Sequence, residues 1–596
     1  MKKALALALS CVMVLGLAAC GSNEVPNSST NTTDANTTSS SNSNTSTATV
    51  EVDTQTAANS VSAAFIDPLT QWGTYDELIT NIKSQTDFEE RTKLMHQAED
   101  ILMSNYCIIP LYYYNDVYLQ KDYVDGIYSN PFGTKFFMYA TMGNGASTLR
   151  LNLASEPDYL DPALNSSVDG ACLAANTFSG LYTYDAAGKT VPALAEGYTV
   201  SDDGLNYTVT LKSGLKWSDG SDLTAADFEY SWKRAVSPDT AADYEYMFSG
   251  FAGYDEGDLQ VSAVDDTTLT FSLTAPCAYI EDLMAFPTFF PVCKAYVEAN
   301  SAAGEPGKWC ADAGFVSNGA YICTGWTHDV AMTYEKNPYW YDADKVTVEK
   351  LEFMLSDDDT ATFAAYNSGD LDFIDEIATD EVATLLANSN PEFHIVDMLG
   401  TYYVAFNCKS ALFEGKTPEQ AACMREAFSL LVDRDYICDN IGQTGQIPAN
   451  SFIPYGMADG NGGIFKDNAE TGYYDAYAIN NDAAATREKA IKLLESAGYL
   501  FDENGMLSSE TPIKIEYLTN TTTTHVAVAE SLQQDFASIG IVMTISQQDW
   551  NVFLEERKNG NFDIAREGWV ADFNDPINML EMCISTSGNN DCQFGR

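Results

Sequence analysis

The stretch IKIEYLTNTTTTHVAVAESLQQDFASIGIVMTI, residues 513–545, decides the fold class. Residues Ile513 to Leu518 have the composition of a strand, and His525 to Ile539 have the spacing of a helix that Gly540 ends. Ile541 to Ile545 then form a second strand. A strand, a helix and a strand in succession make a βαβ unit, whose strands are parallel with a right-handed crossover. The sequence therefore predicts a mixed α/β fold.

Length and charge narrow the class further. A chain of 596 residues is too long to fold around a single hydrophobic core, so two or three domains are expected. Its 45% of hydrophobic residues are enough to form the cores of these domains. The 85 acidic and 31 basic side chains give a net charge of −54, which repels phosphate backbones and excludes nucleic acid as a partner. The four histidines lack metal-ligand spacing, so we predict no metal and no cofactor.

The first twenty residues are a targeting signal. Lys2 and Lys3 precede the apolar run from Ala4 to Leu17, which is too short to span a bilayer as a mature helix. The sequence at residues 17–21, LAACG, resembles the lipobox of bacterial lipoproteins. The resemblance implies that residues 1–20 are a lipoprotein signal peptide and that Cys20 is diacylated, which anchors a protein durably. We therefore expect the protein at the extracellular face of the cell membrane, in the periplasmic space or its equivalent.

Residues 21–56 are rich in Ser, Thr and Asn and are predicted to be a flexible spacer. Eleven cysteines remain beyond Cys11 and Cys20, an odd number. Cys583 with Cys592 and Cys408 with Cys423 are possible disulfides, and free buried thiols are the alternative.

Several short patterns place further elements. Thr86 to Glu89 reads as a capping box before a helix, and Thr224 to Asp227 reads as another. Residues 108–114, IIPLYYY, and the alternating Leu149, Leu151 and Leu153 are predicted strands.

From Thr148 onward the chain resembles the oligopeptide-binding proteins, extracellular solute-binding family 5, which supply peptide ABC transporters. The resemblance rests on the following motifs: GLYTYD (180–185), PALAE (192–196), SDDG (201–204), KWSDG (216–220), LTAADF (223–228), SNGAY (317–321), EKNP (335–338) and GWVADFNDP (568–576). It implies a two-lobed periplasmic-binding-protein type II fold (the Venus flytrap) with an additional domain. It also implies a function: capture of short peptides for the permease subunits of an ABC importer, without catalysis.

The order of the segments departs from that family. Residues 75–79, 108–114 and 130–133 resemble its carboxy-terminal segment, yet here they come first. Gln593-Phe594-Gly595 also echoes Gln71-Trp72-Gly73. We interpret this as a circular permutation joined through residues 143–147, in a chain that is a monomer. A domain swap between neighbouring chains or a mis-assembled reading frame are the alternatives.

The resemblance divides the chain into three domains. Domain I comprises 109–181 and 318–409, domain II comprises 182–317, and domain III, the ligand-binding lobe, comprises 57–108 and 410–596. In the family the lobes close on a hinge over the peptide.

The resemblance also assigns the peptide site. An extended peptide adds as a strand to protein backbone, and the strands implied here are Ser166-Ser167-Val168 and Gly568-Trp569-Val570. Asp572 holds the family's place for the carboxylate that binds the peptide's amino end. Arg566, and with less support Arg557, match positions that meet the carboxyl end. Side-chain pockets are expected from Trp550, Trp569, Tyr402, Tyr403 and one of Tyr112 to Tyr114, for which we take Tyr113. Because Tyr402 and Tyr403 are adjacent on a strand, they face opposite ways, and we expect one of them at most to touch ligand.

Three other functions remain. Residues 213–216 match the Ser-x-x-Lys motif of penicillin-binding enzymes, but the companion motifs of those enzymes are missing. Asp572 and Asp575 could form a general acid/base pair as in glycosidases, but their three-residue spacing is no evidence for that geometry. The same fold serves a peptide sensor or adhesin equally well. Dipeptides, nickel complexes or sugars are the alternative cargoes.

Overall fold

The computed structural model describes residues 64–596 except 154–155, 158 and 469–481. These residues belong to one compact unit, 57–596. The predicted signal peptide, Cys20 and the spacer 21–56 lie outside the described residues. Within the described part, no helix has both the length and the apolar character needed to cross a membrane.

A mixed sheet of eleven strands organises the fold, in the order β13-β14-β15-β6-β16-β1-β17-β21-β19-β20, with β18 paired to β1. Its strands are β13 (Tyr321–Thr327), β14 (Ala331–Lys336), β15 (Lys350–Met354), β6 (Thr148–Asn152), β16 (Phe373–Ile374), β1 (Ile108–Gln120), β17 (Phe393–Phe406), β21 (Ile564–Val570), β19 (Lys514–Asn520), β20 (Val542–Gln548) and β18 (Ile447–Pro448). The predicted strands at 108–114 and 149–153 are therefore confirmed.

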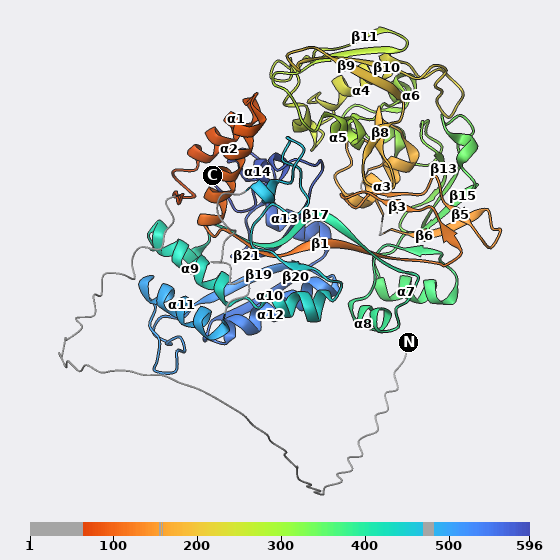
Figure 1. Ribbon diagram of the computed structural model, residues 1–596. Coiled ribbons are helices and arrows are strands. Elements are labelled where there is room, and N and C mark those ends of the chain that lie inside the picture. The colour runs from red at the N-terminus through yellow and green to blue at the C-terminus, as the bar shows by residue number, and fades with distance from the viewer. Residues whose placement is uncertain (1–63, 154–155, 158, 469–481) are drawn as a thin grey trace, which may run out of the picture. The chain divides into compact units, whose positions relative to one another are not determined.

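Two long antiparallel strands, β1 and β17, connect the two parts of this sheet (Figure 1). One end of β1 pairs with β16 at Leu119 and Gln120. At the other end of the ribbon, β17 pairs with β21 from Gly400 to Phe406. Register shifts interrupt the β1–β17 ladder between Pro110 and Tyr112 and between Tyr113 and Asn115. Such bulges bend a ribbon locally, which suits a connection between two parts of a sheet.

The predicted βαβ unit is present. Strand β19, helix α12 (Thr523–Ala537) and strand β20 follow one another, and the two strands pair in parallel from Lys514↔Val542 to Asn520↔Gln548. Helices α9 (Pro418–Leu431), α11 (Ala483–Ser496) and α12 cover one face of these strands. Their apolar sides form one core with Tyr402, Val404 and Phe406 of β17.

The early segment is an integral part of this fold. Helices α1 (Gly73–Ser84) and α2 (Phe88–Ser104) lead into β1, which lies in the interior of the sheet. The chain's last residues pack against α1: Trp72 stacks on Phe594 with 4.0 Å between ring centroids, and the Gly595 N–H donates to the Pro68 carbonyl at 2.8 Å. The two segments that carry the predicted echo therefore lie side by side.

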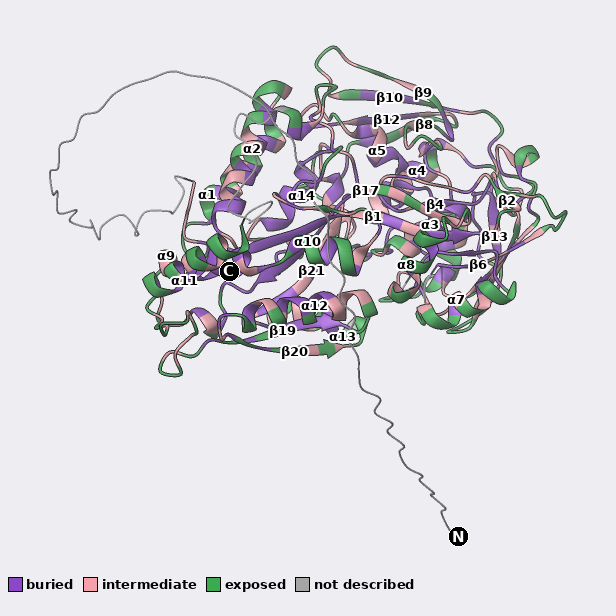
Figure 2. Cartoon of the chain, turned by 60° about the horizontal axis from the view of Figure 1, so that its bottom comes forward, coloured by how far each residue is buried: buried purple, intermediate pink, exposed green. Residues whose placement is uncertain are grey.

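A second sheet has the antiparallel order β11-β12-β10-β9. It comprises β11 (Val261–Asp265), β12 (Thr268–Ser272), β10 (Asn206–Leu211) and β9 (Ala195–Val200), and it packs against α4 (Ala225–Ala235). Short antiparallel pairs are formed by β2 (Val124–Asp125) with β5 (Thr141–Met142), β3 (Tyr128–Ser129) with β4 (Lys135–Phe136), and β7 (Tyr182–Tyr184) with β8 (Thr190–Pro192). The remaining α-helices are α3 (Val168–Thr177), α5 (Ile280–Ala285), α6 (Lys294–Asn300), α7 (Asp359–Ser368), α8 (Thr379–Ala387), α10 (Arg434–Tyr436), α13 (Trp550–Lys558) and α14 (Ile577–Leu580). Buried residues concentrate on the central strands, while the helices expose their outer sides (Figure 2).

Three local predictions have definite outcomes. The capping box at Thr224 is confirmed, with Asp227 reaching back to the Thr224 N–H at 2.9 Å. The prediction at Thr86 is wrong by one residue, because Asp87 is the N-cap and accepts from the N–H groups of Glu89 and Glu90. All eleven described cysteines are free thiols, so neither predicted disulfide is formed.

Candidate ligand-binding site

Strand β21 carries four of the residues predicted to bind ligand, Arg566, Gly568, Trp569 and Val570. On one side it pairs with β17 through Val570, but on the other it pairs with β19 only at Ile564 and Ala565. Within the described residues, the backbone edge of residues 566–570 on the β19 side therefore has no strand partner. An unpaired strand edge is a template for an extended ligand.

Asp572 lies just beyond the end of β21, inside a hydrogen-bonded group. The Tyr244 hydroxyl donates to its Oδ1 at 3.2 Å, and the Asn578 side-chain amide donates to its Oδ2 at 3.0 Å. The Asn578 oxygen accepts from the Trp569 indole N–H at 2.9 Å and from the Asp572 N–H at 3.0 Å. Because Asn578 is fully buried, it fixes Trp569 and Asp572 relative to each other.

The carboxyl group of Asp572 is held in an unusual electrostatic state. Burial raises its pKa to about 7, although the hydrogen bonds from Asn578 and Tyr244 act in the opposite direction. A carboxylate that has been desolvated in this way gains strongly from a cation placed beside it. No basic side chain forms an ion pair with Asp572 among the described residues, so the arrangement suits a ligand cation.

Arg566 projects from the opposite face of β21, toward the core that contains Tyr402. Its guanidinium carbon lies 5.6 Å from the ring centroid of Tyr402 and 5.7 Å from that of Trp550. Tyr402 in turn stacks on Tyr112 at 4.8 Å and lies 5.4 Å from the ring of His525. Gly568 is required beside this group, because a Cβ there would meet the Tyr114 hydroxyl at 2.2 Å.

Two polar atoms here, Arg566 Nε and His525 Nδ1, have no hydrogen-bond partner among the described residues. The hydroxyls of Tyr402 and Tyr517 interact with each other, and that of Tyr402 also interacts with Arg566. Burial, followed by the positive field of Arg566, lowers the pKa of His525 well below its usual value, so the ring is neutral. Unsatisfied buried donors are costly, and together with Arg566 they fit an anionic group such as a carboxylate.

The structure brings other predicted residues into different surroundings. Arg557 is occupied by two buried carboxylates, because its Nη1 lies 2.6 Å from Glu567 Oε1 and its Nε lies 2.7 Å from Asp591 Oδ2. Tyr113 is buried, and its hydroxyl contacts Ser451, Asn450 and Lys466. Trp550 is 47% exposed at the start of α13.

The predicted strand at Ser166-Ser167-Val168 is wrong. Val168 begins helix α3, and the Ser167 hydroxyl caps it by accepting from the Gly170 N–H at 3.1 Å. Val168 nonetheless exposes 41% of its surface. Tyr402 and Tyr403 face opposite ways as predicted, since Tyr402 joins the core under α9 and Tyr403 packs on Phe452.

Sequence reasoning missed four residues of these two groups: Tyr244, Asn578, Tyr517 and His525. Asn578 stands two residues after Asp575-Pro576, but nothing in that spacing indicates its three hydrogen bonds. Tyr244 is 328 residues from Asp572 and could not be linked to it by pattern.

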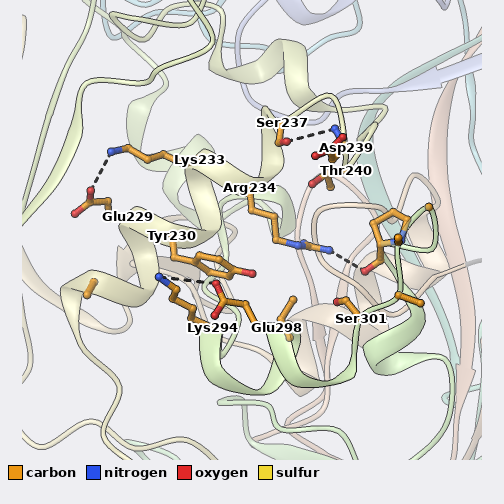
Figure 3. Close-up of a pocket in the computed structure, with 16 residues that line it drawn as sticks. Glu229, Tyr230, Lys233, Arg234, Ser237, Asp239, Thr240, Lys294, Glu298 and Ser301 are labelled. Atoms are coloured by element: carbon orange, nitrogen blue, oxygen red, sulfur yellow. Dashed lines mark hydrogen bonds and ion pairs between the residues drawn. The ribbon is translucent and has the colours of Figure 1, made fainter.

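A pocket of about 850 Å³ lies elsewhere, between α4 and α6 (Figure 3). None of the predicted ligand-binding residues lines it. Its cations already have carboxylate partners, with Lys233 2.9 Å from Glu229, Lys294 3.9 Å from Glu298 and Arg234 2.5 Å from Asp161. We therefore assign the pocket no ligand.

The residues behind the enzyme alternatives are engaged otherwise. Asp575 forms a buried bidentate ion pair with Arg91, with N–O distances of 2.7 and 2.9 Å. Ser213 lies in a turn, and Lys216 pairs with Asp222 at 2.5 Å.

A two-part sheet joined by a long antiparallel ribbon, with the Arg566 guanidinium on strand β21 and the Asp572 carboxyl group just beyond the end of that strand, defines a solute-binding protein of the type II periplasmic class. The chain belongs to the bacterial extracellular solute-binding proteins, family 5. The model of that family, described as "family 5 Middle", matches residues 189–591.

Relatives and solved structures agree with this membership. The chain is 32% identical over 463 residues to the oligopeptide-binding protein OppA of Bacillus subtilis, covering 75% of this chain and 79% of that protein. It is 31% identical to the periplasmic oligopeptide-binding protein OppA of Escherichia coli, with the same coverage. The structure of the Escherichia coli murein tripeptide binding protein MppA matches with a TM-score of 0.65 at 27% identity, over 75% of this chain and 84% of that one. Haemophilus influenzae OppA, solved in complex with RPPGFSPFR, matches with a TM-score of 0.64 at 28% identity, over 76% of this chain and 85% of that one.

Proposed function

We propose that this protein captures oligopeptides outside the cell and delivers them to an ABC importer, without chemically changing them. The observation that carries the proposal is the edge of β21 at residues 566–570, which has no strand partner on the β19 side among the described residues, with Arg566 at its start and Asp572 just beyond its end. The relatives named oligopeptide-binding proteins, and the solved relative with a bound nonapeptide, support the same class of ligand.

The proposed binding mode uses what all peptides share. The peptide backbone adds to the edge at Gly568, Trp569 and Val570, and its amino group lies against Asp572. A charge-assisted hydrogen bond contributes about 1.5–3 kcal/mol, whereas micromolar affinity needs about 8 kcal/mol. The backbone contacts must therefore supply most of the binding energy. Arg566, with Tyr402, Tyr517 and His525, receives the carboxyl end.

Other predicted residues take secondary parts in this proposal. Val168, with Ser166 and Ser167, contributes from the start of α3, and Trp550 and Trp569 line side-chain pockets. Arg557 acts indirectly, by forming a 2.6 Å ion pair with Glu567, which is a residue of β21 itself. Tyr403 packs on Phe452, and the buried Tyr113 contacts Asn450, Ser451 and Lys466, so both residues support the ribbon rather than the peptide.

The location and partners follow from the targeting signal. We propose that Cys20 carries the lipid, that residues 21–56 form the spacer, and that the folded unit meets the permease subunits as a monomer. Domain I (109–181 and 318–409), domain II (182–317) and domain III (57–108 and 410–596) are the proposed lobes.

We also propose that the chain is circularly permuted relative to its family. The alignment to the Bacillus subtilis relative leaves part of both proteins unmatched, with 75% of this chain and 79% of the relative covered. A segment placed at opposite ends of two related chains produces this pattern. The interior position of β1 and the contact of Pro68 with Gly595 support the proposal.

Mass spectrometry of the ligands that co-purify with the full chain tests the function. We expect a mixture of short peptides with free amino and carboxyl ends, released on denaturation. If only sugars or nickel complexes were recovered, the cargo would be one of these and not a peptide. Conversion of an added peptide into products would contradict a purely binding role.

A further inference from the structure

Four buried cysteines lie close together near the start of β1, where the carboxy-terminal segment packs against the fold. Cys107 immediately precedes β1, Cys408 follows β17, and Cys583 and Cys592 come from the last residues of the chain. All four are buried free thiols. They belong to neither ligand-binding group described above.

One pair in this cluster is in direct sulfur contact. The Cys408 thiol donates to Cys107 Sγ at 3.3 Å, although 301 residues separate the two positions. Cys107 and Cys408 occupy matching ends of the antiparallel ribbon, where the Phe406 N–H donates to the Cys107 carbonyl at 2.9 Å. A disulfide bond measures about 2.05 Å, so the two sulfurs, now 3.3 Å apart, must approach each other by roughly a further 1.2 Å to form one.

The thiol of Cys592 contacts backbone rather than either sulfur of the pair. Cys592 Sγ donates to the Cys107 carbonyl at 3.4 Å, and the Cys592 carbonyl accepts from the Cys408 N–H at 3.0 Å. Cys583 uses its carbonyl to accept from the indole of Trp72 at 2.8 Å. These contacts hold Cys107 and Cys408 in position without competing for either sulfur.

A buried cation stands beside Cys107. Arg425 of α9 is 1% exposed and donates from Nε to the Asn105 carbonyl at 2.9 Å, while its Nη2 has no hydrogen-bond partner among the described residues. Among the residues that the structure describes, no carboxylate lies within ion-pair distance of Arg425. Burial raises the pKa of the Cys107 thiol, but the hydrogen bond from Cys408 and the positive charge of Arg425 outweigh it, so that the pKa is lowered. A thiolate is the reactive form in disulfide exchange.

We propose that Cys107 and Cys408 are a disulfide-forming pair that fastens the start of β1 to the end of β17. The oxidant is a small-molecule or protein disulfide. The Cys107 thiolate attacks one sulfur of that disulfide and expels the other as a thiolate, which leaves a mixed disulfide. Cys408, whose pKa is raised by burial, then passes its proton to the thiolate already expelled, attacks the Cys107 sulfur and expels the second thiolate, which takes up the proton that Cys107 released. Two protein thiols are oxidised, one external disulfide is reduced to two thiols, and atoms and electrons balance.

The bond would act mainly on the unfolded chain. A cross-link between residues 301 positions apart removes much of the freedom of the denatured state. Because both cysteines are buried in the folded protein, the exchange takes place while the early segment packs onto β17, or during transient opening of that packing.

Peptide mapping tests the pair. The full chain is refolded with oxidised and reduced glutathione, alkylated at acidic pH and digested without reductant. We expect a peptide that joins Cys107 to Cys408, and a melting temperature roughly 5–10 °C above that of the same sample after dithiothreitol. Cys408→Ser should abolish both the linked peptide and the response to reductant. Cys438→Ser, a buried cysteine outside the cluster, should retain both.

Two results would overturn the proposal. One is a fully alkylated Cys107 and Cys408 after oxidative refolding of the parent chain. The other is a peptide that links Cys107 or Cys408 to Cys592 or Cys583 instead. If Cys408→Ser fails to fold, the map and the reductant response of the parent chain still decide.

Discussion

The Tyr244 hydroxyl lies 3.2 Å from Oδ1 of Asp572, although 328 residues separate them. Tyr244 precedes a short 3-10 helix at Glu245–Phe248, whereas Asp572 follows β21. This contact therefore joins the proposed domain II to the proposed ligand-binding lobe at the carboxylate itself.

Tyr244→Phe should weaken peptide binding about tenfold at pH 7.5, because it removes a hydrogen bond to the carboxylate that holds the peptide's amino group. Titration calorimetry measures the change. Tyr246→Phe is the matched control, since Tyr246 lies 5.9 Å from Tyr244 ring to ring and its hydroxyl does not donate to Asp572 in the structure. Equal losses in both variants would argue against a specific role for Tyr244.

Peptide affinity should depend on pH through Asp572. Its pKa of about 7 in the empty protein means that binding an ammonium group must ionise it. The affinity should therefore fall as the pH drops below about 7, by up to tenfold per unit, and binding should release up to one proton. Calorimetry in buffers of different ionisation enthalpy measures that release at pH 6.

Asp572→Asn serves as the control for the pH experiment. It should bind more weakly and should lose both the proton release and the pH dependence between 5 and 7. A parent protein with the same affinity at pH 5.5 and pH 8 would contradict the proposed role of Asp572.

Arg566 and Arg557 should differ sharply on mutation. Arg566→Gln should weaken binding of peptides with a free carboxyl end about tenfold or more and leave carboxy-amidated peptides unchanged. Arg557→Gln should instead lower the free energy of unfolding by about 3–5 kcal/mol, because Glu567 and Asp591 lose a buried partner. Calorimetry and urea unfolding separate the two effects. A stable Arg557→Gln protein that has lost only carboxylate-dependent binding would reverse the assignment.

The sequence predicted what short-range patterns encode. The βαβ unit at 513–545 was predictable because its apolar periods and Gly540 lie within one continuous stretch. The helix at 88–104 was predicted, but its cap was placed at Thr86 instead of Asp87, since either side chain is a good cap.

The site was predictable only in part. The resemblance placed Asp572 and Arg566 on one segment, but Tyr244 and Asn578 act through contacts that only the folded chain brings together. The same limit explains why the prediction of a strand at Ser166 to Val168 was wrong. Helix α3 begins at Val168, and the hydroxyl of Ser167 caps it. Arg557 was predicted as a ligand-binding cation from its match to a family position, whereas its buried partners Glu567 and Asp591 cannot be recognised from spacing.

The proposed permutation makes a prediction about chain order. Residues 64–147 moved behind Arg596, through a short Gly/Ser linker, should give a chain that folds and binds the same peptides, since the Gly595 N–H already contacts the Pro68 carbonyl. Its melting temperature should stay within about 5 °C of the parent's. Deletion of residues 64–147 is the control and should prevent folding, because β1 would be missing from the sheet. An unfolded relocated chain would contradict the proposed permutation.

The most direct test of the account compares one pentapeptide in two forms by titration calorimetry at pH 7.5, with a free and with an acetylated amino end. The account predicts that the parent protein binds the free form at least tenfold more tightly, and that Asp572→Asn binds both forms alike. Equal affinities of the parent protein for the two forms would contradict it.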